Sequence, residues 1–550
     1  MATYNTPGVY VEEVSNLAPS VVQVATAVPA FIGYTQTGFT GPGPAIARIN
    51  TLLDYTNLFG QANPSAFSVD GNLNVTRSDA ATNNFLMYYA VQMYFLNGGS
   101  TCYIISIGGY KTTTTSPGGT STTTATVPAK ADFEAGLSLL AKQDEPTLVI
   151  LPDAVNLSLE DYYALAQDTL SLCANLADRF AILDVLSSSN TWPAQDITNF
   201  RNNIGINNLC YGAAYYPYLL TSLNYQYLET GVQVTSGSSW SSDANGITVS
   251  QSTNTPANVL ITLGTVTSTA FDTTSTPGTL KINLPAASTT ASAVATAWST
   301  WTGASNNFNV TANGDGSTVL SAVASTALQT VTPSLDAIKS TNSSLYNQVK
   351  VLLAAENVTM PPSSSLAGVY VAVDGGRGVW KAPANVSLAS VVAPVVQISN
   401  TDQGDLNVDP TGGKSINAIR AFTGQGTLVW GARTLAGNDN DWRYISVRRL
   451  FITIEESCQK ASSFAVFESN DAVTWLKVQS MIESYLYGLW EQGALAGTDQ
   501  NSAYFVNVGL GKTMTAQDVL EGRMIVEVGV APVRPAEFII LRFTQLIQQS

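Results

Sequence analysis

An alternation of apolar and helix-forming segments between residues 148 and 216 constrains the fold of this chain more than any other feature of its sequence. Three short apolar segments alternate there with two segments of helical periodicity. Strands joined through a helix lie parallel, because the crossover returns the chain to the same end of the sheet. The pattern therefore predicts a parallel sheet with crossover helices. The expected strands are residues 148–153, 180–185 and 209–216, and the expected helices run from Ser158 to about Ala177 and over residues 192–203.

Several further segments extend this α/β core. Residues 27–35 and 102–108 are rich in apolar and β-branched side chains, which favour strands. Residues 83–96 have the apolar spacing of a helix. Residues 111–127 consist largely of Thr, Ser and Gly, which predicts a surface loop. Residues 366–386 are expected to form a strand and a glycine-rich turn.

Residues 231–341 differ from the rest of the chain in composition. They contain very few charged side chains, and they include short alternating strands at residues 279–284 and 308–311. One amphipathic helix is expected in this stretch, with a single apolar face made by Val294, Ala297, Trp298 and Trp301. We interpret the stretch as a β-rich domain inserted into the α/β core.

The two ends of the chain predict strands in different settings. At the start, residues 9–11 have strand propensity but no local partner, and a lone strand must join a sheet elsewhere. At the end, one helix is expected near Val447, and a second is capped by Asn470 or Asp471 and ended by Gly493. Strands are then expected at residues 523–530 and 538–543, which makes the C-terminal unit α+β.

Composition excludes several kinds of chemistry. The chain has no histidine, so Ser-His-Asp and Cys-His catalysis and histidine metal sites are excluded. Its four cysteines are not at metal-ligand spacing, and we expect buried free thiols in a reducing compartment. A net charge of −15 without a basic cluster disfavours nucleic acid and anionic membranes as partners. The sequence predicts no catalytic residue, no metal and no cofactor.

Charge density and the N-terminus bear on where the protein works. Only 11% of the residues are charged, which suits a surface that is buried against copies of the same chain. The first residues lack the basic and apolar regions of a Sec signal, and no apolar run reaches the length of a membrane helix. We therefore expect a protein that folds in a cytoplasm without inserting into a membrane.

Three kinds of candidate ligand site have plain structural interpretations. Residues 408–415 and 506–513 are similar to phosphate-binding loops, but Val408 and Val506 stand where the first glycine is required, so simple turns are expected. Asp153 and Asp184 lie near strand ends, where open α/β sheets bind ligands, yet helix capping or loop solvation is the favoured interpretation. Residues 437–442 lack the glycine and glutamate of a calcium loop and predict a turn.

Segments from both ends of the chain and from its core form a specific combination. They are residues 4–14 (YNTPGVYVEEV), 97–108 (NGGSTCYIISIG), 379–386 (VWKAPANV), 442–457 (WRYISVRRLFITIEES), 484–497 (SYLYGLWEQGALAG) and 522–543 (GRMIVEVGVAPVRPAEFIILRF). This combination resembles the contractile tail sheath family of phage tails and extracellular contractile injection systems. The resemblance is weak or absent over residues 231–341.

The resemblance implies a structural subunit, not an enzyme. Such a subunit polymerises into a helical tube around an inner tube and contracts to drive it through a target envelope. Its partners are other copies of itself, in a helical homo-oligomer, together with the inner tube protein and the baseplate and terminal cap proteins. It is assembled in a bacterial cytoplasm, as part of a phage tail or of a phage-tail-like particle that can be released from the cell.

In this family, the arms of two subunits add strands to the C-terminal sheet of a third, which is β-augmentation. The resemblance maps the N-terminal donor to Gly8, Val9, Tyr10, Val11, Glu12, Glu13 and Val14. It maps the C-terminal donor to Pro535, Glu537, Phe538, Ile539, Ile540, Leu541 and Arg542. The receiving sheet includes Arg523, Ile525, Val526, Glu527 and Val528.

The expected fold is therefore α/β and α+β multidomain. A central α/β core with a parallel-type sheet carries an inserted β-rich domain and a C-terminal α+β domain, which strands from neighbouring subunits complete. The predicted domains are an extended arm over residues 1–20, the core over residues 21–230 and 342–430, the inserted outer domain over residues 231–341, and the C-terminal sheath domain over residues 431–550.

Two other classes of protein stay open at this point. An α/β hydrolase or nucleotide-binding enzyme would use the section from residue 148 to residue 216, and a secreted Ser/Thr-rich surface protein would fit the composition. Within the sheath class, a phage virion and an injection-system particle are both compatible with the sequence. A single chain with both the arm and the C-terminal domain favours these over type VI systems, which split the sheath into two proteins.

Overall fold

A computed structural model describes residues 20–38, 43–115, 121–187, 194–252, 256–264, 266, 268–274, 278–285 and 289–542. The chain divides into two compact units by its internal contacts. Unit 1 contains Met1–Ala62, Phe85–Ser222 and Thr359–Ser550, and unit 2 contains Asn63–Asn84 and Leu223–Val358. The domain boundaries drawn from the sequence stay predictions.

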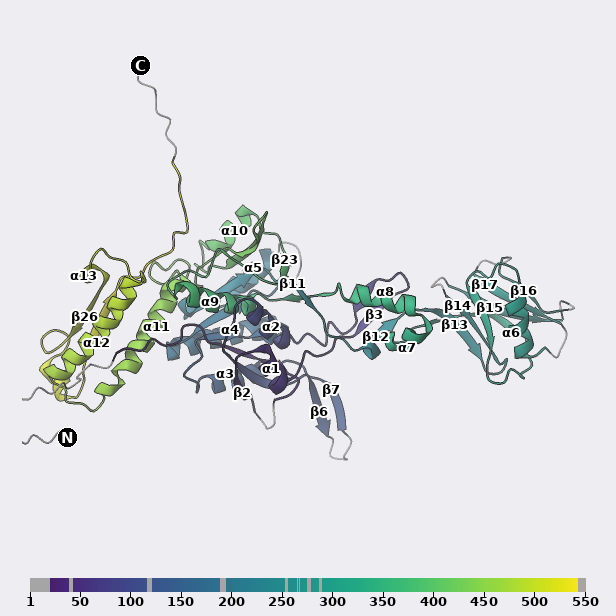
Figure 1. The fold of residues 1–550 in the computed structure, drawn as a ribbon, viewed down its shortest axis with the longest axis horizontal. Coiled ribbons are helices and arrows are strands. Elements are labelled where there is room, and N and C mark those ends of the chain that lie inside the picture. Colours follow the sequence, from purple (N-terminus) through teal and green to yellow (C-terminus); the bar gives the residue numbers. More distant parts are fainter. Residues whose placement is uncertain are drawn as a thin grey trace, which may run out of the picture. The chain divides into compact units, whose positions relative to one another are not determined.

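A mostly parallel sheet forms the centre of unit 1 (Figure 1). Neighbouring strands from β5 to β24 are parallel, whereas β2, β25 and β22 add antiparallel strands at the two edges. The predicted parallel sheet is thus confirmed. In order across it, the strands are β2 (Ala45–Ile49), β5 (Cys102–Gly109), β1 (Pro29–Thr35), β8 (Leu148–Ile150), β9 (Phe180–Asp184), β10 (Gly212–Tyr216), β24 (Asn417–Phe422), β25 (Gly426–Val429) and β22 (Val386–Ser387).

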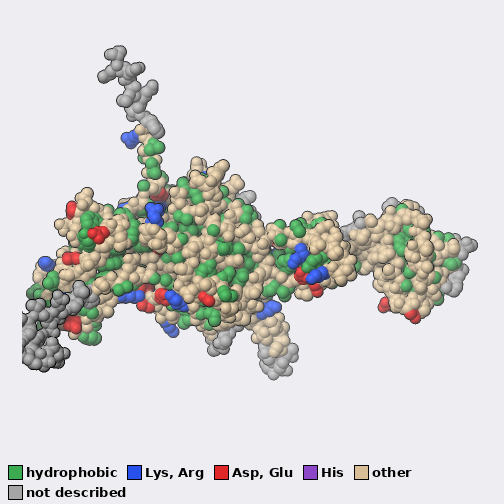
Figure 2. All heavy atoms as spheres, viewed as in Figure 1, with side chains coloured by type: hydrophobic (Ala, Val, Ile, Leu, Met, Phe, Trp, Pro, Cys, Tyr) green, Lys and Arg blue, Asp and Glu red, His purple; other side chains and the backbone are tan. Residues whose placement is uncertain are grey.

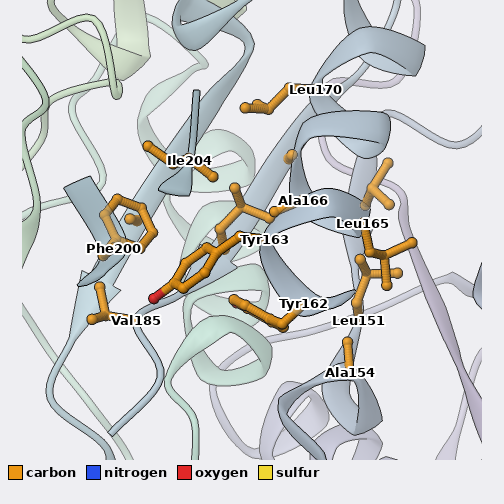
Figure 3. Close-up of a cluster of buried hydrophobic side chains, with 14 of the residues drawn as sticks. Leu151, Ala154, Tyr162, Tyr163, Leu165, Ala166, Leu170, Val185, Phe200 and Ile204 are labelled. Carbon is orange, nitrogen blue, oxygen red and sulfur yellow. The ribbon is translucent and has the colours of Figure 1, made fainter. Parts of the chain in front are cut away.

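Side chains of each central strand alternate between two buried layers, as the pleat of a strand requires. In β1, Ala30 and Ile32 join one apolar cluster and Phe31 joins the other. Figure 3 shows part of the first cluster, in which the rings of Tyr163 and Phe200 lie 5.7 Å apart. Unit 1 therefore has a three-layer α/β/α core. The first layer contains α3 (Lys130–Leu140), α4 (Leu159–Leu176), α5 (Ala194–Asn203) and α10 (Asn400–Asn407), and the second contains α1 (Leu52–Phe59), α2 (Met87–Leu96) and α9 (Ser363–Arg377).

The strand predicted within residues 366–386 is wrong, because these residues begin inside α9. Leu366, Tyr370 and Val373 are buried at helical spacing. Val and Tyr have strand propensity, but such propensity yields to packing. Gly368 makes this packing possible, since a Cβ atom there would lie 2.5 Å from the carbonyl oxygen of Tyr94 on α2.

The surface loop predicted over residues 111–127 is also wrong over most of its described part. β6 (Lys111–Thr115) and β7 (Ser121–Ala125) form an antiparallel hairpin. The hydroxyls of Thr113 and Thr123 lie 2.9 Å apart across it. Threonine favours strands and pairs across them through its hydroxyl group, and this outweighs the low complexity of the segment.

The two buried carboxylates of the sheet cap helices, which confirms the favoured interpretation. Asp153 accepts hydrogen bonds from the backbone N–H groups of Tyr34 (2.8 Å) and Leu86 (2.5 Å), so it holds the start of α2. Asp184 accepts from the N–H (2.8 Å) and hydroxyl (2.6 Å) of Ser363 at the start of α9. Burial raises the pKa of Asp153 to about 6 and that of Asp184 to about 7, against the effect of these donors.

The C-terminal region of unit 1 begins with two long helices, α11 (Ile445–Ala461) and α12 (Ala472–Glu491). Asp471 accepts from the N–H groups of Val473 and Thr474, which confirms it as the cap of α12. Gly493 follows the helix with a φ of 80°. The remaining elements of this region are α13 (Gln500–Ala503), α14 (Ala516–Leu520), β26 (Tyr504–Val508) and β27 (Val526–Val530). Elsewhere in unit 1, residues 219–221 at the start of β11 (Leu219–Asn224) pair antiparallel with β23 (Val391–Pro394).

Unit 2 contains a β-sandwich whose two sheets enclose an apolar cluster. The expected strands at residues 279–284 and 308–311 are confirmed, and Val294 and Trp298 of α6 (Ala291–Thr300) are buried in the cluster. One sheet has the order β18 (Phe308–Ala312), β14 (Ile247–Gln251), β13 (Gly237–Ser242), β20 (Gln329–Val331), and the other has β16 (Ala270–Asp272), β17 (Thr279–Leu284), β15 (Asn258–Leu263), β19 (Val323–Ala327). The unit also contains β12 (Val232–Val234), β3 (Phe67–Val69), β4 (Val75–Arg77), α7 (Leu335–Thr341) and α8 (Ser343–Leu353).

Replacing Gly368 tests the close contact of α2 with α9. Gly368→Ala should lower the free energy of unfolding by about 1–3 kcal/mol, because the added methyl group forces the two helices apart. Gly375→Ala in the same helix meets nothing within 4 Å and is the matched control. It should be neutral or stabilising by up to about 1 kcal/mol, since alanine is the better helix former. Thermal denaturation of both variants measures the difference, and equal losses would contradict the packing argument.

The buried Asp184 predicts a pH-dependent stability. Because its pKa is about 7 when folded, and about 3.9 is usual for an unfolded aspartate, the folded chain binds the extra proton in between. The free energy of unfolding therefore falls as pH rises from about 4 to 7, by at most about 1.4 kcal/mol per pH unit. Asp184→Asn removes this contribution, so its melting temperature relative to wild type should rise between pH 4.5 and pH 7.5. Parallel curves for the two proteins would contradict the prediction.

Candidate assembly interface

β26 and β27 form an antiparallel sheet of two strands in the part of the chain that the structure describes. The strand predicted over residues 523–530 is present but begins at Val526, so the predicted receiving residues Arg523 and Ile525 precede it. The late start has a local cause. The N–H of Arg523 donates to the carbonyl of Asp518 (2.8 Å), and its guanidinium also binds the Asp518 carboxylate (2.7 Å), which holds this stretch in a turn.

The two faces of this sheet differ in burial. Tyr504 and Val506 are buried in an apolar cluster with Ile482 of α12. On the opposite face, the ring of Phe505 covers Gly529, where a Cβ atom would lie 2.2 Å from the ring, and yet Phe505 is 47% exposed. The outer face, which carries Phe505, Asn507, Glu527 and Gly529, is therefore of mixed polarity and leaves a large aromatic ring partly uncovered.

Both edges of the sheet are open among the described residues, because β26 and β27 pair only with each other. An isolated two-stranded sheet is marginally stable in water. Its unpaired N–H and C=O groups are a template for a further strand. The predicted receiving residues Val526, Glu527 and Val528 lie on β27 and so belong to one of these open edges.

The C-terminal segment exposes a continuous apolar run (Figure 2). Phe538, Ile539, Ile540 and Leu541 are 70%, 79%, 78% and 73% exposed. The strand expected over residues 538–543 is not formed in its described part, since no strand lies beside it to complete a ladder. Four large apolar side chains without cover are typical of a segment that docks on another surface.

Glu537 anchors the start of this run to the α/β core of unit 1. The carboxylate of Glu537 accepts two hydrogen bonds from the guanidinium of Arg433, at 2.9 Å from Nε and 2.7 Å from Nη2. It also accepts from the side-chain amide of Asn407 at the end of α10 (2.6 Å) and from the hydroxyl of Tyr444 before α11 (3.1 Å). Burial raises the pKa of Glu537, but the donors, Arg433 first, outweigh it and hold the pKa below its ordinary value.

Arg433 is itself fixed to the central sheet. Its N–H donates to the side-chain oxygen of Asn417 (2.8 Å), and the amide nitrogen of Asn417 donates back to the carbonyl of Arg433 (2.8 Å). Asn417 is the first residue of β24. The anchor, defined as Asn407, Arg433, Tyr444 and Glu537, forms part of the wall of a cavity of 590 Å³ that Phe538 and Ile539 also line. No local sequence signal indicated it, because its residues come together only through the tertiary fold.

The described N-terminal segment also lies against α11. The N–H of Val24 donates to the hydroxyl of Ser457 (3.1 Å), and Arg449 donates to the carbonyl of Thr26 (2.9 Å). The same guanidinium forms a bidentate ion pair with Asp374 of α9 (2.5 and 3.0 Å). The predicted donor residues 8–14 lie outside the described residues, but Val24 and Thr26, which precede β1, are held in place by α11.

The segments that are similar to phosphate-binding loops are occupied by internal contacts. The ammonium of Lys414 donates to the carbonyl of Arg201 inside the protein, and Asp409 accepts from the N–H of Lys414 (3.2 Å). In the second segment, Lys512 lies in a turn after β26. Lys414 lies between a helix, α10, and a strand, β24, which is the reverse of the phosphate-binding order. Lys512 lies between β26 and the five-residue α14, but Val506 stands where the first glycine is required.

The described residues contain neither a metal-binding cluster nor a membrane-spanning helix. They hold no group of three or more His, Cys, Asp or Glu side chains arranged to bind a metal ion. No helix among them is both long and apolar enough to span a membrane.

An open sheet edge together with an uncovered apolar chain end is typical of proteins that exchange strands with their neighbours. The model of the phage tail sheath C-terminal domain matches residues 437–545, which contain both features. The tail sheath protein of Vibrio phage KVP40 is 24% identical over 188 residues, or 34% of this chain and 26% of that protein. The tail sheath protein of Enterobacteria phage T4 is 24% identical over 132 residues, or 24% of this chain and 20% of that protein. The matched region thus spans about a quarter or less of these relatives.

Two solved structures are similar to this chain over almost its whole length. The sheath of the extracellular contractile injection system PVC, in its contracted state, is 27% identical, with a TM-score of 0.57 and coverage of 99% of both chains. The contracted helical sheath of the anti-feeding prophage AFP is 28% identical, with a TM-score of 0.55 and coverage of 99% of this chain and 100% of that one. These matches confirm the resemblance to contractile tail sheath proteins that the sequence indicated.

Breaking the buried ion pair of Arg449 should strongly destabilise unit 1. Arg449→Met leaves the carboxylate of Asp374 buried without a partner, which lowers the free energy of unfolding by about 3–5 kcal/mol. Arg48→Met is the matched control, because the Arg48–Glu145 pair is 46% and 40% exposed. An exposed pair contributes about 0–1 kcal/mol. Chemical denaturation of the two variants measures the contrast, and comparable losses would count against a structural role for Arg449.

Proposed function

We propose that this protein is the structural subunit of a contractile sheath, which polymerises into a helical tube around an inner tube and contracts to drive it through a target envelope. The observation that carries the proposal is the presence, in one molecule, of an open two-stranded sheet and an uncovered apolar chain end. The sheet leaves backbone N–H and C=O groups unpaired at its edges, and the apolar run is exposed to water. When copies of the chain associate, the apolar segment of one copy pairs with the open sheet edge of another, and both are then covered.

Assembly proceeds by β-augmentation between copies. Residues 8–14 of one copy and the C-terminal segment of another add strands to the β26–β27 sheet of a third. Here β27, with the preceding Arg523 and Ile525, is the receiving side. Such contacts are head-to-tail and build an open helix instead of a closed ring. The C-terminal α+β domain over residues 431–550 is therefore completed only in the assembly.

Contraction needs no chemistry in this chain. The extended helix is metastable, and rigid bodies rotate and repack while the arms keep them linked. The internal contacts of Lys414 and the absence of histidine from the sequence support a protein without an enzymatic role. The stored free energy lies in contacts between copies that differ between the two states.

The relatives indicate the other partners. The PVC match is to a sheath complex and one AFP match is to a baseplate, which supports a homo-oligomeric sheath attached to a baseplate. The inner tube protein and a terminal cap protein complete the proposed set. The particle is assembled in a bacterial cytoplasm as a phage tail or a phage-tail-like particle. The β-rich insert over residues 231–341 forms the outer domain of the sheath.

Removing the N-terminal donor tests the proposal. Wild type should form helical tubes visible by negative-stain electron microscopy, whereas deletion of residues 1–14 should leave folded monomers, because the receiving sheet loses one strand. Circular dichroism confirms folding, and sedimentation velocity measures the oligomeric state. Replacing Lys111 and residues 112–125 of the β6–β7 hairpin by a short Gly/Ser linker is a control that should keep the tubes. If the chain lacking residues 1–14 formed normal tubes, the strand-exchange proposal would be wrong.

A further inference from the structure

We infer that the C-terminal donor strand begins at Phe538. The anchor of Asn407, Arg433, Tyr444 and Glu537 fixes the end of residues 531–537, which we call the root. It leaves residues 538–542, which we call the free strand, without contacts of this kind. The inference rests on the proposed function and deepens it. It moves two residues, Pro535 and Glu537, from the donated strand to the body of the donor. It also assigns to the anchor the role of positioning residues for strand exchange between copies.

The first argument is the contrast in burial on the two sides of the anchor. Glu537 is held by three side chains, and its own side chain is only 21% exposed. The next residue, Phe538, is 70% exposed, and the three after it are exposed to a similar degree. A change of this size between adjacent residues marks the point at which the chain leaves the body.

Backbone hydrogen bonds also fix the residues that link β27 to the anchor. The N–H of Ala531 donates to the carbonyl of Ala503 (2.8 Å), and the N–H of Val533 donates to the carbonyl of Ala494 (3.2 Å). Residues 531–533 are therefore held by the C-terminal region, and Glu537 is held by the α/β core. A chain fixed at 533 and again at 537 has little freedom between these points, so the free strand starts from a defined place.

The anchor connects the free strand to the central sheet. A pull on residues 538–542 reaches Glu537, then the two parallel hydrogen bonds to Arg433, and then Asn417 of β24. A bidentate pair of this kind is directional and strong for a hydrogen-bonded contact. Load from a neighbouring copy is thus carried by the α/β core, and it bypasses the two-stranded sheet that receives strands.

A fixed starting point also sets which copy the donor can reach. Because Glu537 is fixed, a shift of the root by a few residues would change the positions with which residues 538–542 can pair. Releasing the anchor lengthens the mobile segment and lowers the effective concentration of the strand at its receiving sheet. The anchor therefore acts on the strength of assembly without touching the neighbour.

The anchor can be tested first on the unassembled protein. Arg433 is 4% exposed, so its guanidinium should react slowly with phenylglyoxal, as measured by mass spectrometry. In Glu537→Gln the ion pair is lost, and labelling of Arg433 should become several-fold faster. Arg48 on β2, at 46% side-chain exposure, serves as an internal reference that labels equally in both proteins. Unchanged labelling of Arg433 would overturn the anchor itself.

The second measurement is the concentration of subunit at which tubes form. Glu537→Gln should raise the concentration of subunit needed for tube formation about tenfold, from the loss of charged hydrogen bonds. Glu134→Gln on α3, whose side chain is 48% exposed and lies outside the donor and receiving segments, is the matched control for charge and should change this concentration little. Arg433→Gln should match Glu537→Gln, and the double variant should be no worse than either single one, since both remove the same contact.

The outcomes separate the two proposals. Additive effects of Arg433→Gln and Glu537→Gln, or tubes from Glu537→Gln at the wild-type concentration, would overturn the positioning role and leave sheath assembly intact. Absence of tubes from wild type would overturn the proposed function, and the labelling of Arg433 would still decide whether the root is fixed. Melting temperatures of the variants close to that of wild type confirm that changes in assembly do not come from misfolding.

Discussion

The buried ion pair between Arg449 and Asp374 is the interaction on which the arrangement of unit 1 depends. Its two side chains are 2% and 4% exposed, so each charge is stable only because the other is present. The guanidinium of Arg449 also lies over the ring of Tyr370, 4.7 Å from its centre, and binds the carbonyl of Thr26. One side chain on α11 thereby joins α9, which covers the central sheet, to the segment that leads in from the N-terminus.

α11 supports both ends of the chain. Ser457 and Arg449 hold the incoming N-terminal segment, and Tyr444, just before the helix, helps to hold Glu537 at the other end. If both ends are strands shared with neighbouring copies, tension between two neighbours passes through this helix and the core beside it. A rigid connection of this kind lets a body rotate as a unit while its links stay intact, as contraction of a sheath requires.

How far the sequence predicted this structure depended on the range of the interactions involved. Local signals were sufficient for the parallel sheet over residues 148–216, for the Asp471 cap and for β17. They failed for α9, where Val and Tyr favour a strand but burial between α2 and the sheet requires a helix. They located the apolar run from Phe538 to Leu541, but the strand predicted there is not formed in the described residues. A strand forms only beside a partner strand, and local signals do not show whether one is present. Arg433 was missed entirely, since its contacts with Asn407 and Glu537 exist only after the core has folded.

The uncovered run Phe538-Ile539-Ile540-Leu541 affects the solubility of the subunit before it is assembled. Short apolar segments of high strand propensity without proline are prone to aggregate. Glu537 and Arg542 flank the run as gatekeeper charges, and Glu537 is already engaged in an ion pair, so the protection is modest. Storage of free subunits at high concentration is therefore hazardous. Under the proposed strand exchange, growth by capture of single subunits at the end of an existing tube would remove this hazard, because each newly added segment would be covered as soon as it arrives.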